Sequence, residues 1–66
     1  MEIFAERLKE LRLEKDLSQA VLAKAVKLSQ SAIKQWENQT RIPNAAAVLA
    51  LAEFFDVTTD YLLGKE

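Results

Sequence analysis

The chain has 66 residues, half of them apolar, a net charge of −1, and neither cysteine nor histidine. A chain this short buries only about 60% of the surface that its unfolded form exposes, and the missing residue types exclude disulfide bonds and the usual zinc sites. The longest apolar run, residues 45–52, is too short to span a membrane, and the first residues do not resemble a signal peptide. We therefore expect one domain over residues 1–66, soluble and cytoplasmic, without metal, cofactor or membrane partner.

The first helix is predicted over residues 2–15. Phe4, Leu8 and Leu11 recur at the spacing of one helical face, and no glycine or proline interrupts the stretch. Leu13 lies off this apolar stripe, so we expect it to be partly exposed. The carboxylates of this helix are spaced like a solvated, salt-bridged face and not like a paired acid site.

Two short helices are predicted next, over residues 19–26 and 30–37, joined by a tight turn at Lys27. Ser18 and Ser29 precede them, and a serine hydroxyl in that place accepts a hydrogen bond from a free N–H group of the first turn. Apolar side chains one turn apart mark the inner faces, and a small residue stands where the helices can cross closely. These inner residues are Leu22, Ala23, Val26, Ile33 and Trp36.

The polar loop of residues 38–43 ends at Pro43, which disfavours helix in the residue before it. A fourth helix is predicted over residues 45–55, with Asn44 as its N-cap. Its apolar residues, Leu49 among them, surround much of the circumference. We therefore expect this to be the most buried helix.

The last helix is predicted over residues 59–63, with Thr58 as its N-cap and Gly64 at its end. Asp56 is expected to end the preceding helix in the left-handed conformation, which aspartate tolerates better than most residues. The predicted elements are thus five helices, with no internal repeat and no linker.

Five segments occur together in an order that is specific as a combination, although each alone would be a weak signal. They are R-L-K-E-L-R (7–12), L-S-Q-A-V-L-A (17–23), S-Q-S-A-I-K-Q-W-E (29–37), R-I-P (41–43) and L-A-E-F-F-D-V-T-T-D-Y-L-L (51–63). In this combination the chain resembles the Cro/repressor, or XRE-type, helix-turn-helix family over nearly its whole length. The resemblance implies an all-α, compact five-helix repressor-like DNA-binding domain, with the helix-turn-helix in helices two and three.

Positive charge is concentrated on the stretch that contains this motif. Residues 15–41 carry a net charge of +3, whereas residues 1–14 carry −1 and residues 42–66 carry −3. A charge asymmetry of this size also occurs by chance among side chains that are charged only because they face water. Its coincidence with a helix-turn-helix pattern nevertheless favours a contact with nucleic acid.

The third predicted helix carries the residues expected to read bases. A helix fits the major groove, where each base pair presents a distinct pattern of donors and acceptors, and the N-terminal part of the helix enters the groove. A glutamine amide can pair with adenine, and a lysine can donate to guanine. The expected base-reading residues are Gln30, Ser31, Lys34 and Gln35, and Ala32 can touch a thymine methyl group.

The resemblance implies a second group of residues that contact phosphate. In the family, the residue that starts the second helix touches phosphate and can brace the first reading residue of the third helix, and here it is Gln19. The loop that family members lay along the DNA backbone contains Asn38, Thr40 and Arg41 in this chain. Such contacts position the protein but carry no base information.

Two departures from the family pattern concern glycine. Lys27 stands where the turn between the two helices usually has glycine, so we expect a positive φ there at a cost of about 1 kcal/mol and a charge close to the phosphates. The loop after Glu37 also often has glycine, and this chain has Gln39.

Some of these residues also have a structural interpretation. Arg12 is an attractive DNA contact, but the resemblance implies an ion pair with Glu37, and such a pair is a strong structural tie. Trp36 can stack on a base, although its spacing from Ile33 favours the core. Lys24 is either a solvated side chain or a contact, and the sequence leaves both open.

These features predict a sequence-specific double-stranded DNA-binding transcriptional regulator of prokaryotic or phage origin. We expect a repressor that binds a pseudo-palindromic operator as a dimer, with residues 30–37 in the major groove. Antitoxins and phage-type repressors would be forms of this function. So small a core cannot bury all of its large apolar residues, and those expected to form the dimer surface are Ile42, Phe54, Tyr61 and Leu63.

The alternative is a protein-interaction module on the same fold, such as an anti-repressor or an antitoxin-like partner-binding domain. The acidic residues 42–66 and the negative net charge favour it. An enzyme is not supported, because no histidine is present to activate Ser18 or Ser29 as a nucleophile, and helix capping explains both serines.

Overall fold

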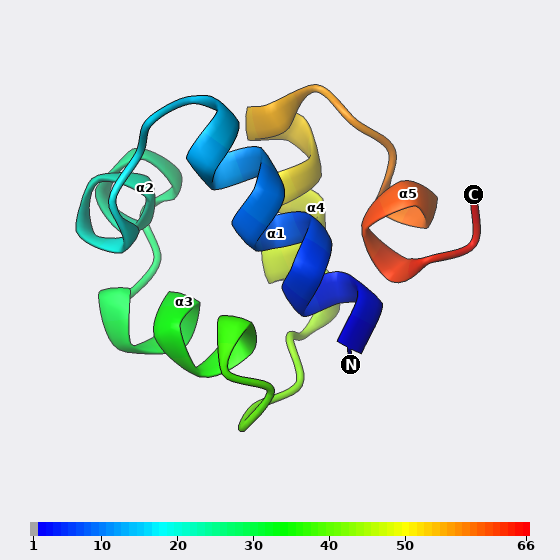
Figure 1. The fold of residues 1–66 in the computed structure, drawn as a ribbon, viewed down its shortest axis with the longest axis horizontal. Helices are drawn as coiled ribbons and strands as arrows, with labels where there is room; N and C mark the ends of the chain where they lie inside the picture. Colours follow the sequence, from blue (N-terminus) through cyan, green and yellow to red (C-terminus); the bar gives the residue numbers. More distant parts are fainter. Residues whose placement is uncertain (1) are drawn as a thin grey trace.

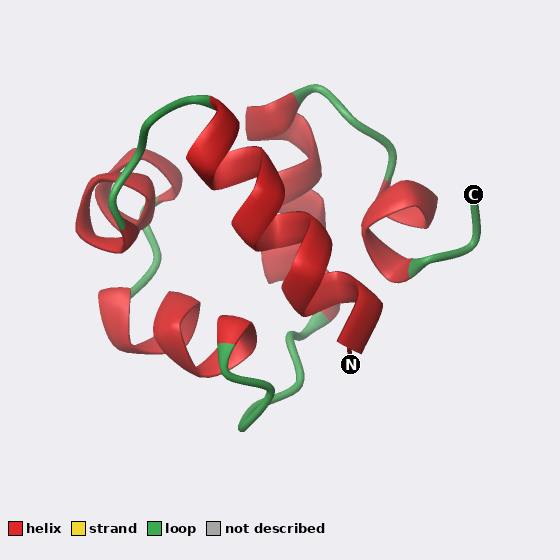
Figure 2. Cartoon of the chain, in the orientation of Figure 1, coloured by secondary structure: helices red, strands yellow, loops and turns green. Residues whose placement is uncertain are grey.

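The structure is a computed structural model that describes residues 2–66. These residues form α1 (Glu2–Glu14), α2 (Gln19–Val26), α3 (Gln30–Glu37), α4 (Ala45–Phe55) and α5 (Thr59–Leu63), with no strand between residues 2 and 66 (Figure 2). The predicted all-α fold is confirmed, and α1 ends one residue earlier than predicted. α1 crosses the middle of the molecule, with α4 behind it, α2 and α3 on one side and α5 on the other (Figure 1). No helix in this range is long and apolar enough to cross a membrane.

Four of the five helices begin at a side-chain cap. An oxygen of each cap accepts a hydrogen bond from the backbone N–H three residues further on, at distances of 2.8–3.1 Å. Each cap thereby satisfies one of the N–H groups that the first turn of a helix leaves unpaired. The caps are Ser18, Ser29, Asn44 and Thr58, as predicted.

All five helices end in the same way. One residue at each end is left-handed, its N–H binds the carbonyl three residues back, and the next N–H binds the carbonyl five residues back. This is the Schellman motif. The left-handed residues are Asp16, Lys27, Gln39, Asp56 and Gly64, with φ between 54° and 82°. The positive φ predicted at Lys27 and Asp56 is confirmed, and four of the five endings are made without glycine.

The core is built around α4, which contributes more buried residues than any other described helix. Its buried residues Val48, Leu51, Ala52 and Phe55 recur along one helical stripe. The expectation that this is the most buried helix is confirmed among the described helices, although Leu49 falls outside the buried stripe and is 52% exposed. α4 therefore has an inner face in the core and an outer face that remains partly apolar.

Replacing Lys27 by glycine tests the cost of a left-handed ending. The left-handed conformation costs an L-residue about 1–2 kcal/mol, and glycine avoids this cost but loses about 0.5–1 kcal/mol in chain entropy. We expect Lys27→Gly to raise the free energy of unfolding by about 0.5–1 kcal/mol in urea denaturation. Lys24→Gly is the matched control, because it removes the same charge within α2, where glycine should lower the stability. Effects of the same sign for both variants would contradict this account.

Candidate nucleic-acid interface

The inner face of α3 anchors this helix on the core. Ile33 and Trp36 are buried, and the Trp36 ring meets the ring of Phe4 edge-on, with centroids 6.3 Å apart. Ala32 is also only 6% exposed, so the expected contact of Ala32 with a thymine methyl group is wrong. Ala32 precedes Trp36 by four residues and therefore lies on the same helical face. Trp36 belongs to the core and does not form a stacking surface for bases.

The outer face of α3 is polar and open. Gln30, Ser31 and Lys34 are exposed, and Gln35 is half-buried. The amide nitrogen of Gln35 donates to Ser31 Oγ at 3.1 Å. The structure thus places the four residues expected to read bases on the accessible part of one helix, and two of them are already hydrogen-bonded to each other.

Exposed cations lie on α3 and on the chain segments next to it. Lys27 lies in the turn before α3 and Arg41 in the loop after it. Lys24 lies on α2 and Lys34 on α3 itself. Within residues 2–66 the ion pair of Arg12 with Glu37 is the only one, so no close carboxylate neutralises these four charges. These four exposed charges are thus available to an anionic partner without first breaking an ion pair.

Arg12 and Glu37 form the ion pair that the resemblance implies. Arg12 Nε lies 2.7 Å from Glu37 Oε2 and Nη2 lies 2.9 Å from Oε1, while Nη1 donates to the Leu17 carbonyl at 2.7 Å. The two side chains are only 10% and 5% exposed. The hydrogen bonds to Glu37 raise the pKa of Arg12 above its usual value, against the opposing effect of burial. The pair therefore ties α1 to the end of α3 and is not available to DNA.

Gln19 joins the same network, which the sequence does not reveal. Its amide nitrogen donates to Glu37 Oε1 at 3.2 Å. The expected brace between Gln19 and Gln30 is not among the hydrogen bonds of the described residues, and Gln19 instead holds the other end of α3. No local pattern predicts this bond, because the two partners are 18 residues apart in the chain.

Of the loop residues expected to contact phosphate, Asn38 and Arg41 are exposed, and Asn38 ends α3. Thr40 is exposed too, but its hydroxyl donates to the backbone carbonyl of Gln35 at 3.3 Å. That hydroxyl proton must leave the carbonyl before it can reach a phosphate. Arg41 is thus the loop residue best suited to an ionic contact.

The four residues expected to form a dimer surface do not form one patch. Ile42 is 73% exposed in the loop before α4, and Leu63 lines a pocket beside that loop. Phe54 lies near the opposite end of α4, and the guanidinium of Arg7 covers the ring of Tyr61 at 4.2 Å from its centroid. Of the four, Leu63 lines this pocket, and Ile42 directly precedes Pro43 in its lining.

The sequence profile of the helix-turn-helix family matches residues 8–62, which include all of α2, the turn and α3. The chain belongs to the helix-turn-helix family. It is similar to the HTH-type transcriptional activator BcrR of Enterococcus faecalis, with 40% identity over 63 residues, and to repressor protein C2 of Salmonella phage P22, with 37% identity over 62 residues. These alignments cover 96% and 94% of this chain but only 31% and 29% of those proteins, so the chain spans about a third of their length.

Solved structures of this helix-turn-helix family have the same fold. The P22 c2 repressor in complex with a synthetic operator matches with a TM-score of 0.89 at 35% identity, over 100% of both chains. The restriction-modification controller protein C.AhdI of Aeromonas hydrophila matches with a TM-score of 0.84 at 34% identity, over 92% of both chains. The helix-turn-helix of this chain is therefore held in the same five-helix frame.

Glu37→Leu tests whether the ion pair maintains that frame. The variant leaves the buried Arg12 guanidinium without a carboxylate, and we expect the free energy of unfolding to fall by about 3–5 kcal/mol in urea denaturation. The double variant Arg12→Met/Glu37→Leu should recover part of this loss, because no unpaired charge is left buried. Arg41→Met, at an exposed cation, is the control and should change stability by less than about 0.5 kcal/mol. A loss below about 1 kcal/mol for Glu37→Leu would show that the pair is not a structural tie.

Proposed function

We propose that this chain is a sequence-specific double-stranded DNA-binding transcriptional regulator that inserts α3 into the major groove. The observation that carries the proposal is the polar, open outer face of α3, held on the core by a buried inner face. A helix fits the width of the major groove, and amide and ammonium groups match the base edges displayed there. Similarity to a transcriptional activator and to a repressor whose structure includes an operator supports the proposal.

The residues divide into readers and positioning contacts. Gln30 and Lys34 are exposed on the outer face and can reach base edges directly. Lys27, Asn38 and Arg41 flank α3 and are suited to phosphate contacts, which set the register of the domain on the duplex. Gln19 and Thr40 can serve the same purpose only by giving up an internal hydrogen bond, so we assign them weaker phosphate contacts.

Repression is the mode of regulation that needs the fewest parts, because occupancy of an operator is enough to exclude other proteins from it. We therefore propose that the chain acts as a repressor.

Relatives from a bacterium and a phage support a prokaryotic or phage origin, and with it a cytoplasmic location.

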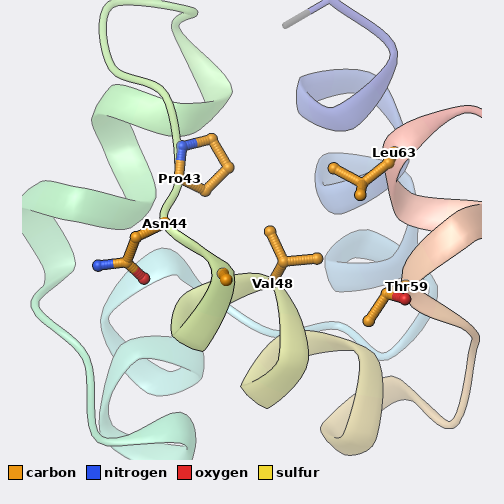
Figure 3. A pocket seen from close by; sticks show the side chains of 6 residues that line it. Pro43, Asn44, Val48, Thr59 and Leu63 are labelled. Atoms are coloured by element: carbon orange, nitrogen blue, oxygen red, sulfur yellow. The ribbon is translucent and has the colours of Figure 1, made fainter.

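We also propose that the domain binds its operator as a dimer. Two copies about 34 Å apart would place two α3 helices in successive turns of the major groove, which matches a pseudo-palindromic site. An open pocket of about 350 Å³ lies between the start of α4 and α5, and its lining side chains are drawn in Figure 3. Its lining is mainly apolar: Pro43, Asn44, Ala45, Val48, Thr59 and Leu63. Ile42 directly precedes this lining, so in a two-fold arrangement the Ile42 side chain of each copy can fill the pocket of the other.

A titration of labelled duplexes at low salt tests the main proposal, because electrostatic binding is strongest there. We expect binding to random duplexes, and tighter binding to sequences selected from a random pool. No interaction with any duplex at low salt would refute the proposal and favour the protein-interaction alternative.

Two substitutions distinguish readers from positioning contacts. Gln30→Ala should cost about 1–3 kcal/mol on the selected site and relax the preference at one base pair. Arg41→Ala should weaken binding to all sequences alike and reduce the slope of log K against log salt by roughly 1. Dissociation constants over a series of salt concentrations measure both effects. The reverse pattern would mean that the two roles are exchanged.

Ile42→Gln tests the dimer surface. The variant replaces the exposed apolar side chain by a neutral polar one, and we expect weaker cooperativity on a two-half-site operator with unchanged affinity for a single half-site. Leu13→Gln is the matched control, because Leu13 is 53% exposed on α1 and does not line this pocket. Sedimentation of the operator complexes counts the copies bound. Equal cooperativity for wild type and Ile42→Gln would place the dimer surface elsewhere.

A further inference from the structure

The two glutamines on the outer face of α3 differ in how they are held. Gln30 is exposed in the first turn, whereas Gln35 is half-buried in the last turn. The amide nitrogen of Gln35 donates to Ser31 Oγ one turn earlier. Its backbone carbonyl accepts from both Thr40 N, at 2.9 Å, and Thr40 Oγ1, at 3.3 Å. Gln35 is thus restrained through its side chain and through a main-chain carbonyl with two donors, whereas the Gln30 side chain makes no hydrogen bond to the described residues.

This restraint leaves a defined hydrogen-bonding edge. A glutamine amide has two N–H donors and one carbonyl acceptor, and the bond to Ser31 uses one donor. When this bond uses the N–H that points away from the carbonyl oxygen, the other N–H and the oxygen lie side by side on the planar group. Adenine presents the complementary pair in the major groove, with its N6 amine as donor and N7 as acceptor, whereas guanine presents two acceptors. The Gln35 amide, when fixed in this way, is complementary to adenine and not to guanine.

We propose that Ser31 is a positioning residue that fixes the amide of Gln35, and that the two residues together recognise one adenine. The proposal rests on the proposed function and assigns Ser31 a different role from that of an independent base reader. Ser31 then contributes to specificity through Gln35, and its loss should be felt at the base pair that Gln35 reads.

The effect should be larger on DNA than in the free protein. A hydrogen bond between side chains one turn apart on a solvated helix surface is weak, because water competes for both partners. In the groove the amide is desolvated and must take one orientation, so a side chain that is already oriented loses less conformational freedom on binding. We expect removal of the Ser31 hydroxyl to weaken binding to the adenine-containing site about three- to ten-fold.

The test begins with the full chain and a pool of random duplexes, from which wild type selects a site. Dissociation constants are then measured for this site and for duplexes with each base pair changed, using Ser31→Ala, Gln35→Ala and the double variant. Ser31→Thr and Ser31→Val form a matched pair of nearly equal shape, one with the hydroxyl and one without. Ser31 is exposed, so these variants should fold, and urea denaturation verifies this.

We expect Gln35→Ala to abolish a preference for adenine at one position. Ser31→Ala and Ser31→Val should reduce the preference at that same position, Ser31→Thr should retain most of it, and the double variant should lose no more than Gln35→Ala alone. The proposal is overturned if Ser31→Ala relaxes a different position, if the two single losses add, or if the position that Gln35→Ala relaxes is not adenine. Failure of wild type to bind any duplex at low salt would instead refute the proposed function, and it is seen before any variant is compared.

Discussion

One guanidinium group joins three parts of the chain. Arg12 binds both carboxylate oxygens of Glu37 and the Leu17 carbonyl, so the end of α3 is coupled to α1 and to the segment before α2. A buried ion pair often adds little stability over apolar residues of the same size. What this pair supplies is a fixed geometry, because the planar fork of arginine donates to both oxygens of a carboxylate in a restricted set of orientations. The ion pair helps to fix the orientation of α3, and with it the direction in which the side chains of its outer face project.

The residues of α3 that pack in the core differ from those proposed to contact DNA. Ile33 and Trp36 hold the helix on the core, while Gln30 and Lys34 are exposed and can be exchanged without opening a cavity. A helix built in this way can acquire a new base preference at little cost in stability. The structural match to the P22 c2 repressor, with a TM-score of 0.89 at 35% identity, shows how much sequence change the frame itself accepts.

Local signals in the sequence predict the helices well. Serine, threonine and asparagine caps act within one turn, and Lys27 and Asp56 adopt the left-handed conformation expected of them. The errors concern interactions that join distant residues or depend on the rotation of a helix about its axis. The burial of Ala32 depends on how α3 is rotated against the core, and the bond from Gln19 to Glu37 depends on how α2 and α3 pack. The hydroxyl of Thr40 turns back to Gln35 because the loop begins in a Schellman motif at Gln39.

The five identical helix endings have a kinetic consequence. The bonds that end each helix join residues at most five positions apart, so the residue at which each helix ends is set by local contacts alone. The connections between helices are also short, the longest being the seven residues between α3 and α4. Chains dominated by such local contacts fold within microseconds to milliseconds. Helices as short as these are marginal in isolation, so they should become stable as they pack, with α1 docked against α3 and α5.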